Sequence, residues 1–338
     1  MLFPFAEYWW FYGVFTVFVV AMLALDLGVF HRRAHEVSLR EAISWSAVWV
    51  SLALVFCMLL YLYCDWKFAP DPGVAALTGG AVRGRAQQTA LEFLTGFLVE
   101  KALSLDNIFA FYLVFQFFGI PARYQHRILF IGIVGALFFR VIFIALAAVL
   151  VKYHTLVILF GLLLILTGVK FFFGSASSPD FESNFAIRLL RRFLPVADID
   201  GHKFFSRVAG RLHATPLLLA LVFVEASDIV FAVDSVPAIF AITEEPLLVF
   251  TSNVFAMLGL RAMYFIVAGI VPRFHLLKYA LALILVFIGL KMALLNEAFG
   301  GKFPIIWSLG IILSVLAIGI LASVFVSRKT RAQQNARN

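Results

Sequence analysis

Long apolar stretches separated by short polar segments run the length of this 338-residue chain. A transmembrane helix needs roughly 17 to 25 mainly apolar residues. Stretches of that kind lie near residues 8 to 30, 41 to 64, 91 to 118, 128 to 151, 155 to 174, 214 to 242, 247 to 271, 276 to 295 and 303 to 327. The pattern predicts an all-α polytopic membrane protein with about nine transmembrane helices in a single transmembrane domain, residues 1 to 338.

Composition and charge support this interpretation and orient the chain. Hydrophobic residues make up 63% and charged residues 14%, whereas a soluble chain is about 25% charged. If the N-terminus lies outside, 17 arginine and lysine residues of the loops and tail lie inside and 5 lie outside. This asymmetry is what the positive-inside rule predicts. We therefore expect a plasma (inner) membrane protein with a cytoplasmic C-terminus, whose net charge of +8 reflects topology rather than a nucleic-acid partner.

Two parts of the chain resemble each other at a constant offset of 121 residues. The offset superimposes identical residues, pairing Arg140 with Arg261, His154 with His275, Gly168 with Gly289 and Lys170 with Lys291. Extended backwards with a shorter loop, it places Asp106 over Asp234. Each copy spans three predicted helices, and an odd number of crossings inverts the second copy. We predict inverted repeats over residues 91 to 174 (helices three to five) and 214 to 295 (helices six to eight), a basic cytoplasmic loop at 175 to 213, and peripheral helices in 1 to 64 and 303 to 327.

Both repeats carry acidic side chains early in their first helix. In the sixth predicted helix these are Glu225, Asp228 and Asp234. A carboxylate at the centre of a membrane helix costs about 2.5 to 3.5 kcal/mol, so we expect these side chains to face a polar interior. Pro237 follows three residues later and cannot continue regular hydrogen bonding. We therefore predict that this helix is broken or bent near Asp234.

The third predicted helix supplies matching groups in the run VEKALSLDNIF. Carboxylate, amide and hydroxyl oxygens suit hard divalent cations such as Mn²⁺, Mg²⁺ or Ca²⁺, and neither acidic run contains the histidine or cysteine that zinc or copper prefers. The predicted metal ligands are Glu100, Asp106, Asn107, Glu225, Asp228 and Asp234. We expect four further residues to support the site or balance its charge: Ser104, Ser235, Arg140 and Arg261. The two arginines either form fixed ion pairs or move into the acidic site when the cation leaves.

Three runs resemble signatures of the TerC family of integral membrane proteins. They are VEKALSLDNIFAF (residues 99 to 111), VEASDIVFAVDSVPAIFAIT (224 to 243) and TSNVFAMLGLRAMYF (251 to 265). The resemblance covers nearly the whole chain. It implies export of manganese from the cytoplasm, and it implies that the six predicted ligands occupy the positions of the family's conserved acidic and polar residues.

The primary hypothesis is a membrane transporter that exports a divalent cation, Mn²⁺ before Ca²⁺, by alternating access at an intramembrane carboxylate site, with proton coupling as a further hypothesis. The alternative is a non-transporting membrane scaffold or assembly factor associated with metal or tellurite stress. We expect no enzyme activity, because the chain has neither a His-Glu-x-x-His nor a Gly-x-Ser-x-Gly run. No cofactor besides the transported ion is expected, and the expected partners are that ion and the lipid bilayer. No oligomeric state is predicted.

Overall fold

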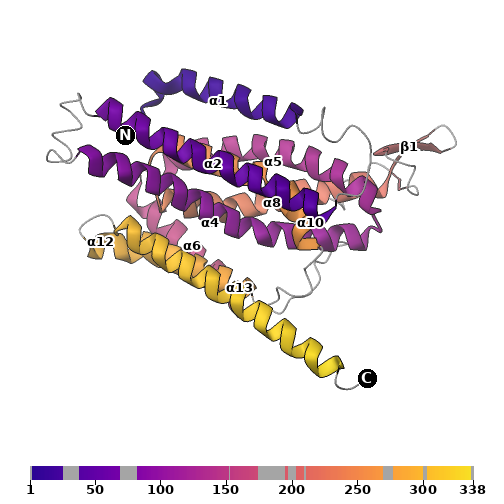
Figure 1. Cartoon of the computed structure of the whole chain (residues 1–338). Helices are drawn as coiled ribbons and strands as arrows, with labels where there is room; N and C mark the ends of the chain where they lie inside the picture. Colours follow the sequence, from indigo (N-terminus) through magenta and orange to yellow (C-terminus); the bar gives the residue numbers. More distant parts are fainter. Residues whose placement is uncertain are drawn as a thin grey trace.

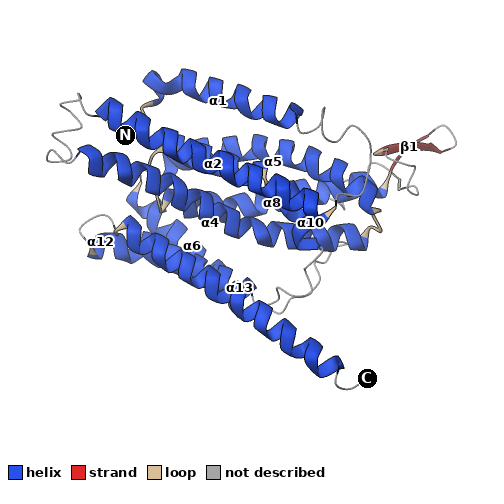
Figure 2. Ribbon diagram, viewed as in Figure 1, coloured by secondary structure: helices blue, strands red, loops and turns tan. Residues whose placement is uncertain are grey.

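A computed structural model of the chain describes residues 2–25, 38–68, 82–151, 153–173, 195–196, 203–208, 211–268, 277–299 and 303–335. Within these ranges the chain is almost entirely helical, with one pair of short strands (Figure 2). The elements are α1 (Phe5–Leu25), α2 (Leu39–Phe68), α4 (Val82–Phe117), α5 (Ala122–Leu150), α6 (His154–Phe173), β1 (Phe205–Val208), β2 (Arg211–Ala214), α8 (Pro216–Phe240), α9 (Pro246–Leu258), α10 (Leu260–Ala268), α11 (Leu277–Leu290), the π-helical turn η3 (Lys291–Leu295), α12 (Asn296–Ala298) and α13 (Ile305–Asn335). The predicted all-α architecture is confirmed.

The helices form an elongated bundle with α4 and α8 in its interior (Figure 1). Helix α4 packs against α2, α8, α9 and α10, and α8 packs against α4, α5 and α6. A further pair, α6 and α11, packs together along its length, and α13 lies against α11 and α4. Helices α1 and α13 lie at opposite edges of the bundle in Figure 1. The two helices that carry the predicted ligands are therefore surrounded by other helices.

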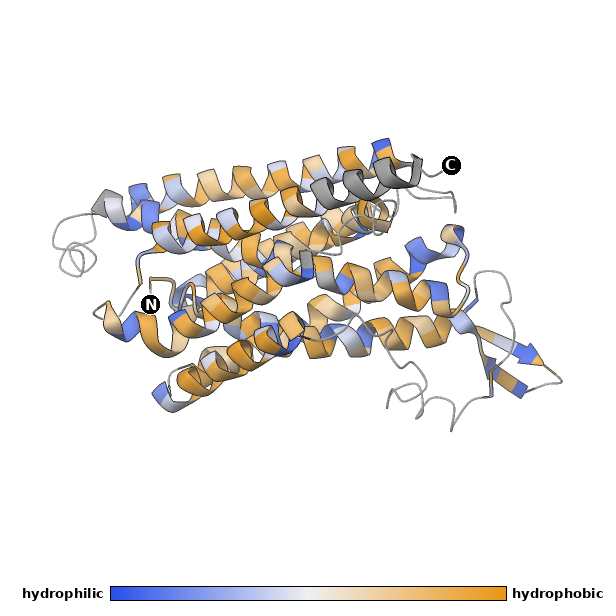
Figure 3. Cartoon of the chain, turned by 90° about the horizontal axis from the view of Figure 1, so that it is seen from below, coloured by the Kyte–Doolittle hydropathy of each residue, from blue (hydrophilic) through white to orange (hydrophobic). Residues whose placement is uncertain are grey.

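Apolar residues dominate the helices, and hydrophilic residues gather at the helix ends and on the strands (Figure 3). Among the described residues, six helices are long and apolar enough to cross a membrane, or seven if the bent pair α9–α10 is one span. The other two predicted spans correspond to α6, whose apolar part is short, and to α4, whose apolar part carries Glu100, Lys101 and Asp106. The structure shows a polytopic helical membrane protein, and the count of nine spans stays a prediction.

Prolines and one glycine mark the ends of the central helices. Pro216 and Pro246 occupy the first positions of α8 and α9, and Pro121 directly precedes α5. A proline at a helix start costs no hydrogen bond, because its missing N–H would have no partner there. Gly119, in the turn between α4 and α5, has a φ of +60°, which glycine adopts without steric cost.

The prediction was a break or a bend near Asp234, and the break is wrong, because α8 is one helix there. It continues through Pro237 to Phe240, and because Pro237 lies in the last turn, the helix loses a hydrogen bond only close to its end. Irregular backbone lies elsewhere in the described chain: α9 and α10 meet at a 43° bend around Gly259, and α11 continues into η3. A side chain at position 259 would collide with Lys101, whose Nζ lies 2.6 Å from the place of a Cβ atom. Lys101 of α4 therefore occupies the space beside Gly259 at the bend, where its Nζ also donates to the backbone carbonyl of Ala256 at 3.1 Å.

The predicted cytoplasmic loop contains a strand pair that was not predicted. Strands β1 and β2 are antiparallel, with Phe205 opposite Ala214. The pair leads into α8 and lies at the same end of the bundle as the C-terminus, whereas the N-terminus lies at the other end (Figure 1). Most of the segment from 175 to 213 lies outside the described residues.

Helices α6 and α11 approach each other through glycines. A Cβ atom on Gly161 would lie 2.9 Å from the carbonyl oxygen of Gly289, and one on Gly168 would lie 2.7 Å from that of Ala282. Residue numbers rise on one helix as they fall on the other, so the pair is antiparallel. The offset of 121 converts Gly161 into Ala282 and Gly168 into Gly289. Each contact is thus the counterpart of the other under this offset, and the inverted repeat itself stays a prediction.

Candidate cation-binding site

Helices α4 and α8 cross where the sequence places buried polar residues. Asn107 Nδ2 of α4 donates to Asp228 Oδ1 of α8 at 3.5 Å, while Glu100 of α4 and Ser235 of α8 line one cavity. This pairing runs in opposite chain directions, so α4 and α8 are antiparallel. The crossing brings polar groups of both predicted repeats around one point.

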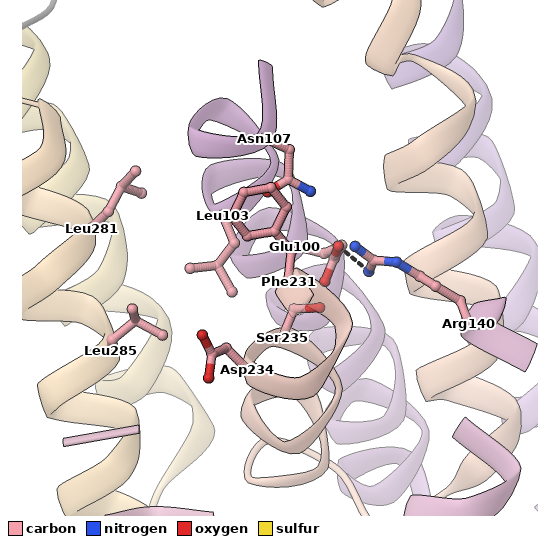
Figure 4. A pocket seen from close by; sticks show the side chains of 9 residues that line it. All are labelled: Glu100, Leu103, Asn107, Arg140, Phe231, Asp234, Ser235, Leu281 and Leu285. Carbon is pink, nitrogen blue, oxygen red and sulfur yellow. Dashed lines mark hydrogen bonds and ion pairs between the residues drawn. The ribbon is translucent and has the colours of Figure 1, made fainter. Parts of the chain in front are cut away.

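The cavity at this crossing has a volume of about 30 Å³, enough for a water-sized particle. Its polar lining comes from α4, α5 and α8, and two leucines of α11 form the wall opposite Arg140 (Figure 4). The lining residues are Glu100, Leu103, Asn107, Arg140, Phe231, Asp234, Ser235, Leu281 and Leu285. The cavity is therefore a small polar space with an apolar side.

An ion pair occupies one side of the cavity. Arg140 Nη1 donates to Glu100 Oε1 and to Asn253 Oδ1 (Figure 4 shows the pair with Glu100). All three side chains are buried, with 3% of Arg140 exposed and none of Glu100 or Asn253. A buried charge needs a partner of opposite sign. The structure thus pairs Arg140 with one of the predicted ligands.

Several buried polar atoms near this crossing have no hydrogen-bond partner among the described residues. They are Glu100 Oε2, Arg140 Nε, Ser235 Oγ and, farther along α8, Glu225 Oε2. An unpaired buried polar group costs about 1 to 3 kcal/mol, and folded proteins usually satisfy such groups with water or a ligand. Glu100 and Ser235 both line the cavity. The cavity therefore has an unsatisfied oxygen on each of the two crossing helices.

The three acids of α8 face three different helices. Glu225 lies against α5, where a Cβ atom on Gly135 would be 2.1 Å from Glu225 Oε1. Asp228 faces α4 through the contact described above, and Asp234 accepts a hydrogen bond from Thr167 Oγ1 of α6 at 3.3 Å. Successive residues of a helix turn by about 100°. Acids at these spacings therefore spread around the helix rather than pointing one way.

The predicted ligands are consequently not gathered into one coordination shell. Among the residues that the structure describes, no group of three or more histidine, cysteine, aspartate or glutamate side chains is placed to hold a metal ion. The cavity is lined by three of the predicted ligands: Glu100, Asn107 and Asp234. Asp228 adjoins it through Asn107, and Glu225 faces α5. The side chain of Asp106 lies outside the described part of the chain.

The four predicted supporting residues differ in position. Ser235 and Arg140 line the cavity. Ser104 is buried, but its hydroxyl donates to a backbone carbonyl of its own helix at 2.7 Å. Arg261 of α10 does not line the cavity and is directed to α5, where its Nη1 donates to His126 Nε2 at 2.6 Å. Arg140 therefore contacts a carboxylate, and the offset of 121 relates it to an arginine that contacts an imidazole.

Two partners of the site and a second polar cluster were not predicted. Asn253 stands in an apolar helix, and such a residue is a recognisable signal, whereas a hydroxyl such as that of Thr167 forms ordinary contacts between membrane helices. The second cluster surrounds Glu92, which is 3% exposed and accepts hydrogen bonds from Thr243 Oγ1 at 2.7 Å and Gln88 Nε2 at 3.0 Å. Nothing in the sequence indicated that Glu92 is buried, because this acid lies at the polar start of an apolar stretch.

Comparisons with known proteins agree with this architecture. The protein family described as "Integral membrane protein TerC family" matches residues 85–331 of this chain. The "Uncharacterized membrane protein STKORF319" of Myxococcus xanthus is 50% identical over 316 residues, which cover 93% of this chain and 92% of that protein. Proteins named "Putative membrane-bound redox modulator Alx" in Escherichia coli (strain K12) and Salmonella typhi are 41% and 42% identical, over 96% and 95% of this chain and 97% of each relative. No solved structure matches the chain. Because the family match and these relatives span nearly all of the helices described above, the chain belongs to the TerC family of integral membrane proteins.

Proposed function

We propose that this protein carries a divalent metal cation, first of all Mn²⁺, across the membrane through the crossing of α4 and α8. The observation that carries the proposal is a pair of buried oxygens, Glu100 Oε2 and Ser235 Oγ, that have no hydrogen-bond partner in the described part of the chain and share one cavity with Asp234. Such oxygens suit Mn²⁺, Mg²⁺ and Ca²⁺, and ionisable residues inside a membrane protein mark ion pathways. The choice of manganese comes from the family resemblance, since the oxygen donors suit Ca²⁺ as well.

In this mechanism Arg140 competes with the cation for Glu100. The guanidinium neutralises Glu100 when no ion is bound, which makes the buried carboxylate tolerable. A cation bound between Glu100 and Asp234 would repel the guanidinium, because two like charges at one carboxylate interact strongly in a weakly polar interior. Arg140 would keep its second acceptor, Asn253. Ion binding would thereby be coupled to movement of α5 relative to α4.

The inverted repeat would supply the opposite half of the cycle. The predicted repeat relates α4 to α8 and α5 to α9, so the helix pair α5–α8 corresponds to the pair α9–α4. Both pairs are in contact. Between α4 and α8 the offset is 128, which converts Glu100 into Asp228. When the repeats exchange conformations, as inverted-repeat transporters do, Arg261 would pair with Asp228 and Arg140 would release Glu100.

We also propose that transport is export, with the N-terminus outside and the C-terminus in the cytoplasm. The strand pair and the C-terminus lie at one end of the bundle (Figure 1), and the loops and tail assigned to that side hold most of the positive charge. Exchange of protons for the cation within the cavity would couple export to proton entry.

Transport by the purified protein in liposomes tests the proposed function. Mn²⁺, Ca²⁺, Mg²⁺ and Zn²⁺ are supplied in turn, with and without a pH gradient. We expect Mn²⁺ uptake that is lost in Glu100→Gln and Asp234→Asn and retained in Glu244→Gln, which changes an exposed acid outside the cavity. Failure of a folded protein to move any of the four cations, or normal uptake by both cavity variants, would contradict the proposal.

Two other functions have less support. If the protein is a scaffold whose buried charges serve only folding, cells that express Asp234→Asn at normal membrane levels should contain as much manganese as cells with the wild-type protein.

The Alx relatives are named for a redox role. The chain's two cysteines, Cys57 and Cys64, are free and lie seven residues apart on α2. That spacing is about 10 Å along a helix, too far for a disulfide between them.

A further inference from the structure

Gly135 lies directly against the Glu225 carboxylate. A Cβ atom at position 135 would lie 2.1 Å from Glu225 Oε1, 2.3 Å from Oε2 and 2.4 Å from Cδ. Real side chains do not approach this closely, so the carboxylate occupies the space that any residue larger than glycine would fill. Helices α5 and α8 are packed together around this contact. The glycine is therefore what allows the charged group to lie between two membrane helices.

We propose that Gly135 is a positioning residue that seats the Glu225 carboxylate on the path of the transported cation. The proposal rests on the proposed function and assigns a role to a residue that cannot itself bind an ion. Glu225 Oε2 is buried and has no hydrogen-bond partner among the described residues. Glu225 precedes Asp228 by about 4.5 Å along the helix axis, toward the end of the bundle that carries the strands. A cation that approaches from that end would meet Glu225 before Asp228.

The expected displacement of the Glu225 carboxylate should change ion binding more than it changes the stability of the fold. A methyl group at 135 would have to push Glu225 Oε1 from 2.1 Å to at least 3.4 Å, where ordinary contact begins. Metal ligands tolerate deviations of about 0.2 Å, so the displaced carboxylate could not serve as a ligand in the same place. The moving group is the flexible end of a long side chain, and the backbone need not shift. Gly135→Ala should therefore change ion handling with little effect on folding.

Helix α5 offers a matched control one turn away. Gly132 also faces α8, but a Cβ atom there would meet Val224 Cγ1 at 2.8 Å. Valine is apolar and stiff about its first side-chain torsion, so Gly132→Ala applies similar pressure between the same helices without touching a carboxylate. We expect Gly132→Ala to lower the melting temperature slightly and to leave Mn²⁺ uptake per folded molecule unchanged.

In liposomes, Gly135→Ala should raise the half-saturating Mn²⁺ concentration at least tenfold while keeping the wild-type melting temperature. Glu225→Asp shortens the side chain by one methylene, so it should restore part of the loss in the Gly135→Ala background and have no such effect on Gly132→Ala. Normal Mn²⁺ uptake by Gly135→Ala would overturn the proposal. So would a double variant no better than Gly135→Ala, provided that Glu225→Asp alone is active.

A stability measurement decides the matter if Glu225→Asp is inactive by itself or if the wild-type protein moves no Mn²⁺. Gly135→Val adds more volume than the carboxylate can yield, so it should lower the melting temperature, and Glu225→Ala should restore part of that loss. Glu225→Ala should not restore Gly132→Val. Absence of this selective rescue overturns the proposal. If the selective rescue is seen in a protein that carries no cation, Gly135 still positions the Glu225 carboxylate, and the proposed function is rejected instead.

Discussion

Single side chains at the α4–α8 crossing decide how the protein interior holds charge. Glu100 is fully buried, with one carboxylate oxygen on Arg140 and the other unsatisfied. The ion pair with Arg140 offsets the free-energy cost of removing this carboxylate from water during folding. A cation would therefore find a positioned ligand but would have to displace a guanidinium. Stability and ion handling should separate when the two residues are changed singly and together.

Arg140→Gln should destabilise the folded protein by about 3 to 5 kcal/mol, because it leaves the Glu100 carboxylate buried without its partner. Thermal unfolding in detergent measures the loss. The double variant Arg140→Gln/Glu100→Gln removes both charges and should recover most of the stability while remaining inactive in transport. If the double variant is as unstable as Arg140→Gln, Arg140 acts through packing rather than through its charge.

Mn²⁺ should stabilise the folded protein against heat. A ligand at 100 times its dissociation constant adds about 2.7 kcal/mol when it binds only the folded state. We expect a Mn²⁺-dependent rise in melting temperature for the wild-type protein and for Glu244→Gln, and none for Asp234→Asn, which removes a cavity carboxylate. A rise of equal size in Asp234→Asn would place the bound ion outside the cavity.

Between whole helices, the glycine contacts of α6 and α11 are the most sensitive to side-chain size. A Cβ atom on Gly289 would lie 2.6 Å from the Gly161 carbonyl oxygen, a backbone atom that cannot move without shifting a helix. Gly289→Ala should therefore cost about 1 to 3 kcal/mol of stability, as overpacking does. Gly310→Ala in α13 is the control, since nothing lies within 4 Å of a Cβ atom there. Equal melting temperatures for the two variants would refute the close approach of α6 and α11.

Helix positions followed from the sequence wherever apolar length alone determines them. Helix α2 was expected at 41 to 64 and runs from Leu39 to Phe68. Helix α4 begins at Val82, well before the expected 91, because a polar segment can extend a helix beyond its apolar part. The bend at Gly259 was not predicted, because neither a proline nor a polar break marks it in the sequence. The break expected at Pro237 did not occur, because α8 ends three residues later.

The residues of the candidate site were predictable by type, but their partners were not. Acids such as Glu100 and Asp228 are costly in a membrane, so their chemistry is visible in the sequence. Which neighbour compensates each one depends on helix packing, and packing directs Glu225 to a glycine of α5. Asn253 holds Arg140 from a helix more than one hundred residues away. A periodicity argument cannot assign such a pair.

At the scale of the whole molecule, the distribution of positive charge predicts the orientation in the membrane. We predict that the segment from 69 to 81 lies outside and that the C-terminus lies in the cytoplasm, because most of the positive loop charge lies on the side of the C-terminus. Alkaline phosphatase inserted after residue 75 should be active, and a fluorescent protein fused to the C-terminus should fluoresce. The reverse pair of results would contradict the proposed orientation.

Exchange of arginine partners is a prediction about the whole molecule, because it requires the two repeats to trade conformations. In the state described, Arg140 pairs with Glu100 while Arg261 donates to His126. If the opposite-facing state pairs Arg261 with Asp228, removing Arg261 should favour the described state. Weakening the other pair with Arg140→Lys should favour the opposite one, because the shorter ammonium reaches the Glu100 carboxylate less well.

Single cysteines at the two ends of the bundle would report this shift. In a background without Cys57 and Cys64, Gln88→Cys places a thiol near the Glu92 cluster and Gln125→Cys places one near the other end of α4 and α5. In each variant, labelling by a membrane-impermeant maleimide should rise at one of the two positions and fall at the other. The position at which labelling rises should differ between Arg261→Gln and Arg140→Lys. Since a fixed ion pair has no second state to favour, identical labelling in both variants would show that the arginines only hold the helices together.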